Sequence, residues 1–221
     1  MSYFTKELIS FFTELEKNNN REWFAENKSR YENYVKIPFE HFVQDMIFTI
    51  QEVDENLITS PKEAIFRIYR DIRFSKDKTP YKNHVSAVIA NGGRKNVTDP
   101  AVYIEINANE MKFYSGIYQM DKDQIYNVRS FIASNLDEFN DLLKEKDFKK
   151  YFGTIHGEQN KILPSEFKEI AKTQPLIANK QFYYFGKLPQ NKILSKTLTK
   201  DLMKYYFAAQ PMSKFLQEAL G

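Results

Sequence analysis

The chain contains no cysteine, and among its 221 residues it has seven glycines, eight prolines and no long apolar run. Without cysteine, a disulfide, a thiolate nucleophile and a cysteine-ligated metal are excluded, which suits a reducing compartment. No stretch approaches the roughly 20 apolar residues that cross a bilayer, and the opening MSYFTKELISFF lacks the apolar core of a secretion signal. We therefore expect a cytoplasmic protein without a membrane-spanning segment.

The common motifs of metal and cofactor sites are also missing. The three histidines, His41, His84 and His156, are far apart, and neither an HExxH pattern nor an EF-hand loop is present. The NGG turn at residues 91–93 lacks the spacing and the lysine of a phosphate-binding loop. We therefore predict no metal and no cofactor. No motif assigns a catalytic residue, so the sequence leaves open whether the protein is an enzyme.

Nothing in the sequence divides the chain into separate domains. It has no linker rich in Pro, Gly or Ser, no internal repeat, and enough residues to bury a core. Charged residues at 28% and aromatic residues at 15% are typical of a globular protein whose core is rich in Phe and Tyr. We predict a single domain over residues 1–221, and the sequence indicates no oligomeric state.

Apolar residues at helical spacing predict helices toward both ends of the chain, and alternation with a period of two predicts strands between them. The predicted helices cover residues 8–15, 21–36, 38–53, 121–136, 137–150 and 202–220, the last interrupted near Pro211. The predicted strands cover residues 64–74, 84–90, 101–108, 111–119 and 181–186. This order predicts an α+β protein: a mostly antiparallel sheet of about five strands, covered by N-terminal and C-terminal helices.

The third and fourth predicted strands form a hairpin with one apolar and one polar face. The buried face would consist of Val102, Ile104, Ile106, Met111, Phe113 and Ile117. The other face is aromatic and polar. Within it, Gly116 would leave room for something to approach the backbone.

Positive charge is concentrated in residues 66–82, which read FRIYRDIRFSKDKTPYK. This segment has six cations against two anions and is therefore net +4, whereas the whole chain is +3. The residues outside this segment sum to about one negative charge, so the excess positive charge of the chain is concentrated in residues 66–82. That concentration is the best indication of a site.

Three arginines of this segment would converge on an anion. On a strand Arg70 would point into an apolar face, where it needs a partner, and Asp71 would orient Arg67 or Arg73 two residues away. Guanidinium groups suit bidentate recognition of phosphate or carboxylate. The predicted ligand-binding residues are Arg67, Arg70, Asp71, Arg73, Lys78, Tyr81, Lys82 and His84.

Two of these residues have more than one interpretation. Tyr81 can anchor the loop that holds it or stack on a ring. His84 can act as an acid or base that nearby cations keep neutral, or it can be an ordinary hydrogen-bonding residue at the start of a strand.

A longer pattern carries a resemblance to a known family. The string Arg67-x-x-Arg70-Asp71-x-Arg73-Phe74-x-x-Asp77-Lys78-x-x-Tyr81-Lys82 resembles the signature of an uncharacterised bacterial family, domain-of-unknown-function family 2461. The stretches NNNREWFAENKSRY from Asn18 and GIYQM at residues 116–120 are similar to other marked stretches of that family. At Gln174 and Pro175 the chain departs from an Asp-His-Pro-like step of the relatives. The resemblance implies a single cytosolic domain and singles out the same arginines.

Three functions follow from these residues. The first is binding of an anionic small molecule, bearing phosphate or carboxylate, through the arginine cluster, with catalysis left open. The alternative is a structural or protein-interaction domain whose arginines are paired internally. The third is weak nucleic-acid binding by the basic loop, against which the near-neutral remainder of the chain argues.

Overall fold

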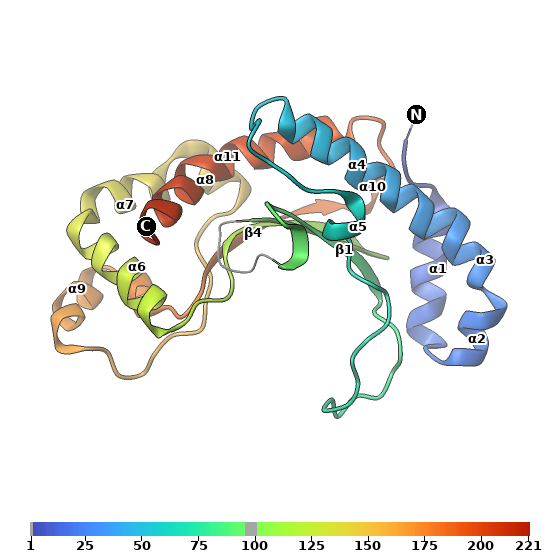
Figure 1. Ribbon diagram of the computed structural model, residues 1–221, viewed down its shortest axis with the longest axis horizontal. Helices are drawn as coiled ribbons and strands as arrows, with labels where there is room; N and C mark the ends of the chain where they lie inside the picture. The colour runs from blue at the N-terminus through green and yellow to red at the C-terminus, as the bar shows by residue number, and fades with distance from the viewer. Residues whose placement is uncertain (1, 96–100) are drawn as a thin grey trace. The chain divides into compact units, whose positions relative to one another are not determined.

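The computed structural model describes residues 2–95 and 101–221 (Figure 1). Helices and one antiparallel sheet make up its regular structure, which confirms the α+β class. The described residues form two compact units. Unit 1 consists of residues 2–95, 103–113 and 187–203, and unit 2 consists of residues 101–102, 114–186 and 204–221.

Unit 1 holds the helices predicted over residues 8–15, 21–36 and 38–53, the second of them divided into shorter helices, together with short helices that were not predicted. They are α1 (Lys6–Lys17), α2 (Arg21–Glu26), α3 (Lys28–Tyr31), the π-helical turn η1 (Glu32–Lys36), α4 (Ile37–Gln51), α5 (Pro61–Ala64), η2 (Gly93–Lys95) and α10 (Gln190–Ile193). Side chains of Thr5 and Asn20 accept backbone N–H groups at the starts of α1 and α2, so both helices begin where a capping residue permits. Helix α4 packs against β1.

Unit 2 holds α6 (Lys122–Ser134), α7 (Leu136–Lys144), α8 (Lys146–Tyr151), η3 (Ser165–Phe167), α9 (Lys168–Thr173) and η4 (Pro175–Ala178). Asp121 and Gln124 form a capping box at the start of α6. Helix α11 (Leu198–Glu218) begins in unit 1 and continues in unit 2. It runs through Pro211 without the predicted interruption. Phe207, whose carbonyl loses its helical partner, is exposed, so water can satisfy that group.

The sheet has the strand order β1-β2-β3-β4, with β1 (His84–Ile89), β2 (Val102–Asn107), β3 (Glu110–Ile117) and β4 (Phe182–Pro189). All six residues of the predicted apolar hairpin face are buried. The other face is half-buried, as the alternating burial along β2 and β3 shows. Both faces of the hairpin are therefore as the sequence predicted.

The predicted strand at residues 64–74 is wrong, so the sheet has four strands rather than five. Beyond α5 the chain forms two isolated bridges, Ile65 with Ala87 and Tyr69 with Tyr81. Backbone N–H groups of Phe66, Lys82 and Arg70 donate to the carbonyls of Ser86, Ile68 and Pro80 at 2.9, 2.8 and 2.9 Å. Because residues 65–83 double back and pair with themselves, Arg70 avoids the apolar sheet face, where its charge would be costly.

We call residues 65–83 the arm. In Figure 1 it is the blue-green double segment that extends away from β1. Phe74 is 96% exposed near its tip.

None of the helices within residues 2–95 and 101–221 combines the length and apolar character needed to span a membrane.

Candidate functional site

The tip of the arm holds Arg70 within the chain itself. The Arg70 guanidinium pairs with the Asp77 carboxylate at 2.5 Å, donates to the carbonyl and hydroxyl of Thr79, and reaches the Ser75 hydroxyl at 3.4 Å. The backbone N–H of Thr79 and the Arg70 side chain lower the pKa of Asp77 to about 2. Arg70 is thus engaged by oxygens of the arm, and its geometry stabilises the reversal of the chain.

Asp71 orients Arg73, as one of the sequence interpretations predicted. The two side chains form a bidentate pair, with Nε to Oδ1 at 3.0 Å and Nη2 to Oδ2 at 2.7 Å. These hydrogen bonds lower the pKa of Asp71 to about 2. Lys78 donates from Nζ to the Ile72 carbonyl at 2.9 Å, which again ties the tip to itself. Arg70 and Arg73 therefore each have an acidic partner in the chain, Asp77 for the first and Asp71 for the second.

Tyr81 anchors the base of the arm. Its ring stacks on Phe24 of α2 with centroids 4.0 Å apart and planes inclined by 12°, and it is 6% exposed. The Asn19 side chain forms hydrogen bonds with both backbone groups of Tyr81: its Nδ2 donates to the Tyr81 carbonyl, and its Oδ1 accepts the Tyr81 N–H. Tyr81 therefore serves as packing and is not available to stack on a bound base.

Arg67 and Lys82 lie at the base of the arm, away from the tip. No carboxylate among residues 2–95 and 101–221 lies within 4 Å of either charged group. The Lys82 ammonium sits over the Phe66 ring, 4.9 Å from its centroid. Partial burial lowers the pKa of Lys82, the Arg67 charge lowers it further, and Glu105 opposes both.

His84 connects these cations to the polar face of the sheet. Its Nε2 lies 3.8 Å from Glu105 Oε2 on β2, and Lys112 on β3 lies 3.8 Å from Glu105 Oε1. The Tyr103 hydroxyl donates to Glu105 at 3.1 Å. Burial lowers the pKa of His84, Glu105 opposes that shift, and Lys82 and Lys112 add to it. His84 is therefore neutral at pH 7, in the direction that the sequence predicted.

We call Arg67, Lys82, His84, Glu105 and Lys112 the sheet-face cluster. All five belong to unit 1, and the last three come from three neighbouring strands. Next to His84 on the same face of β1, Ser86 is buried, and its hydroxyl has no hydrogen-bond partner in the described chain. Among the eight predicted site residues, the charge of Arg67 acts on Lys82 and on Asp71, and the charge of Lys82 acts on His84. Arg70, Asp71, Arg73 and Lys78 belong to the tip of the arm, and Tyr81 belongs to its base.

Gly116 does permit a close approach to the backbone, and the partner is the neighbouring strand. A Cβ atom at this position would lie 2.2 Å from the Phe182 carbonyl oxygen, and the residue has φ of +95°. The room that the sequence indicated is thus filled by β4.

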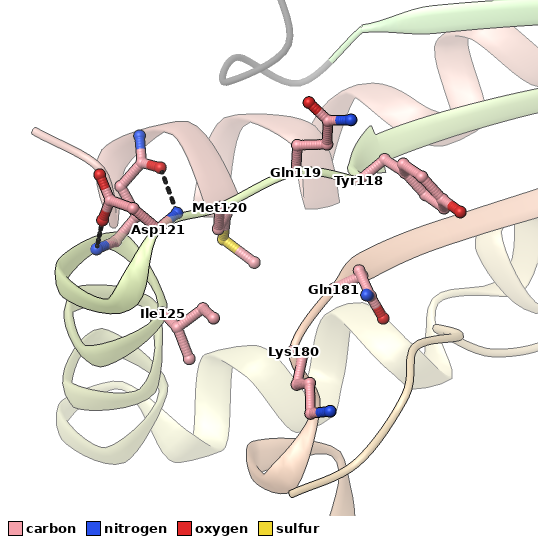
Figure 2. Close-up of a pocket in the computed structure, with 8 residues that line it drawn as sticks. Tyr118, Gln119, Met120, Asp121, Ile125, Lys180 and Gln181 are labelled. Carbon is pink, nitrogen blue, oxygen red and sulfur yellow. Dashed lines mark hydrogen bonds between the residues drawn. The ribbon is translucent and has the colours of Figure 1, made fainter. Parts of the chain in front are cut away.

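A pocket of about 610 Å³ lies in unit 2, where the chain leaves β3 and approaches β4 (Figure 2). It is lined by Tyr118, Gln119, Met120, Asp121, Gln124, Ile125, Lys180 and Gln181. In Figure 2 the side chains of Met120 and Ile125 extend toward the side on which Lys180 and Gln181 lie. Asp121 Oδ1 accepts the N–H groups of Asp123 and Gln124, so this carboxylate caps α6.

Sequence reasoning missed Glu105, Lys112 and this pocket. Glu105 and Lys112 carried a usable signal, because both lie on the polar face of the predicted hairpin. Gln174, where the chain departs from the relatives, is buried and bonds to Asn140 at 2.6 Å and to the N–H of Leu176. Its role is to cap η4.

A comparison with protein families matches residues 7–215 to the family described as Conserved hypothetical protein (DUF2461). A search of curated proteins found no match.

Proposed function

We propose that this chain, which belongs to the DUF2461 family, binds a small molecule bearing phosphate or carboxylate. Arg67, Lys82 and His84 would form the binding site. The observation that carries the proposal is the absence of a carboxylate within 4 Å of Arg67 or Lys82 in the described chain, although Lys82 is half-buried. The Phe66 ring is a cation–π partner for Lys82, but a half-buried cation without an anionic partner is costly, and an anionic ligand would lower that cost. The proposal concerns binding and includes no chemical step.

The chemistry of the three groups suits such a ligand. The Arg67 guanidinium offers a planar fork of donors for two ligand oxygens, whereas the Lys82 ammonium acts as a compact charge. Neutral His84 can donate one further hydrogen bond, and Glu105 lies close enough to orient its ring. Arg70 and Arg73 are excluded from this version of the site because in-chain carboxylates engage both.

A titration of thermal stability with inorganic phosphate and with citrate tests the proposal, using sodium chloride at matched ionic strength as the reference. We expect both anions to raise Tm with saturation. Arg67→Ala and Lys82→Met should each weaken the apparent affinity by about tenfold, the effect of one charge-assisted contact. Lys76→Ala is the matched control, because it removes one exposed positive charge from the tip of the arm. An equal loss in Lys76→Ala, or no saturable shift in the wild type, would refute the site.

The internal pairing of Arg70 and Arg73 favours a second candidate, an interaction domain whose arm docks on a partner. Phe74 at 96% exposure is the group that would enter an apolar recess of that partner. The partner could be a protein or a nucleic acid, and fluorescence anisotropy with a labelled single-stranded oligonucleotide distinguishes the two. Binding that falls steeply with salt and weakens in Phe74→Ala would identify nucleic acid as the partner of the arm.

A further inference from the structure

We infer that the pocket of unit 2 binds a short, uncharged, extended peptide. This site is independent of the sheet-face cluster, which belongs to unit 1. Four features of the pocket support the inference: its size, its apolar side chains, the unpaired backbone on one side, and the oriented amide on the other.

The size and apolar lining suit a ligand of two or three residues. A volume of about 610 Å³ lies within the range of roughly 300–1,000 Å³ that is usual for small-molecule sites. Met120 and Ile125 are both half-buried and extend into the pocket (Figure 2). A thioether beside a branched aliphatic group forms an adaptable apolar surface.

The backbone on the β3 side lacks partners. Strand β3 ends at Ile117, and within residues 2–95 and 101–221 no backbone hydrogen bond joins the N–H or carbonyl groups of Gln119 and Met120. The next N–H, that of Asp121, bonds to the Gln124 side chain at 3.0 Å. An extended segment with free donors and acceptors is the template to which a peptide adds as a strand.

The opposite side offers a fixed amide donor. Gln181 Oε1 accepts the N–H of Glu158 at 2.7 Å, so its Nε2 keeps two N–H donors that have no acceptor in the described chain. This hydrogen bond also fixes the orientation of the amide. A ligand carbonyl is the group that would complete it.

The charges of the lining are already used, so the ligand is uncharged. Lys180 pairs with Glu158 at 3.4 Å, and Asp121 caps α6. The other edge of β4 is occupied near its start, because His156 bridges Tyr183 and Gln159 bridges Asn179. Among the residues of these two segments, the backbone groups without hydrogen-bond partners therefore lie only on the β3 side of the pocket. Backbone donors and acceptors beside an apolar patch are matched better by an extended peptide than by a ligand that consists of a single ring.

Titration of the ¹⁵N-labelled chain with the capped tripeptide acetyl-Leu-Gly-Leu-amide, followed by amide chemical shifts, tests the inference. We expect saturable shifts at Gln119, Met120 and the Gln181 side-chain amide. Gln181→Glu should weaken binding about tenfold, since a carboxylate still accepts the Glu158 N–H but repels a ligand carbonyl. Asn127→Asp, which adds the same charge at an exposed position of α6, is the control and should leave the affinity unchanged.

A second variant, Ile125→Ala, removes apolar contact and should also weaken binding without unfolding the chain, because Ile125 is half-buried. Absence of shifts, shifts confined to other residues, or equal loss in Gln181→Glu and Asn127→Asp would overturn the inference. Uridine serves as the second probe, because it carries carbonyl acceptors on a ring. If uridine shifted the same amides while the tripeptide did not, the peptide assignment would be wrong.

Discussion

Gly116 has a conformation and an environment that no other residue type can adopt without cost. Its φ of +95° lies in the left-handed region, and a Cβ would overlap the backbone of β4. The overlap involves a carbonyl oxygen and a Cα atom rather than the end of a flexible side chain. The backbone of β4 therefore cannot move away from an added Cβ without losing its register with β3.

We expect Gly116→Ala to lower the free energy of unfolding by at least about 2 kcal/mol, because backbone strain and a steric clash add. Gly92→Ala is the matched control: its φ is +73°, but no atom lies within 4 Å of the added Cβ. It should cost about 1 kcal/mol through strain alone. Urea denaturation of both variants measures the difference, and equal losses would show that contact with β4 contributes nothing.

Partners of single side chains were predictable only at short range. The pairing of Asp71 with Arg73 follows from strand-like geometry over two residues. The partner of Arg70, Asp77, lies seven residues away and comes near because the chain reverses between them. Similarly, nothing in the sequence around Tyr81 indicates that Phe24 stacks on it, since the two residues are 57 positions apart.

Among the elements, the arm has few contacts outside itself at its tip. The Arg70 side chain donates hydrogen bonds to Ser75, Asp77 and Thr79, and the Lys78 side chain donates to the Ile72 carbonyl. Segments held by their own polar side chains open independently of the core. The stability of the tip therefore depends on one guanidinium.

We expect Arg70→Ala to raise amide hydrogen exchange over residues 71–79 by about tenfold, because four oxygen atoms on three residues lose their donor. Global stability should change by less than about 1 kcal/mol, as is usual for a surface ion pair. Exchange read by mass spectrometry and denaturation by urea measure the two quantities. Arg73→Ala serves as the control, since its side chain is 77% exposed and, within the described chain, forms an ion pair with Asp71 alone. Loss of the whole fold in Arg70→Ala would contradict this role.

Elements with a long and regular pattern were predictable, and the arm was not. Helices α1, α4 and α6 follow the helical spacing of their apolar residues, and the faces of β2 and β3 follow strict alternation. Residues 64–74 also alternate, but alternation does not distinguish a strand inside a sheet from a strand that pairs with its own return segment. The cost of burying Arg70 decides between them, and that cost depends on contacts distant in sequence.

At the scale of the whole molecule, the division into two units passes through strands. Residues 110–113 of β3 belong to unit 1 and residues 114–117 to unit 2, while β4 is divided between residues 186 and 187. The single domain predicted over residues 1–221 therefore stays our proposal.

We expect one cooperative unfolding transition in urea. Trp23 is the only tryptophan and lies in unit 1, so its fluorescence reports that unit, whereas far-UV circular dichroism reports the helices of both. The two curves should coincide within error if the chain unfolds in two states. A circular dichroism transition that continues after the fluorescence change is complete would show that the units unfold separately.

The candidate sites were predictable only in part because both depend on tertiary pairing. Arg67, Lys82 and His84 were named from the charge pattern, but Glu105 joins them through a strand 18 or more residues away. The pocket of unit 2 arises where residues 118–120 and 180–181 come near one another, about 60 positions apart. Tyr118, Gln119 and Met120 belong to the stretch GIYQM that resembles the family, but nothing in that stretch indicates that residues 180–181 lie opposite it.

The protruding arm also makes the molecule convenient to label. Because the chain has no thiol of its own, Lys76→Cys would create a unique attachment point at the exposed tip of the arm and would leave Phe74 in place. A spin label or a fluorescent dye placed there would stand clear of the packed interior, and its mobility would report directly when a partner immobilises the arm.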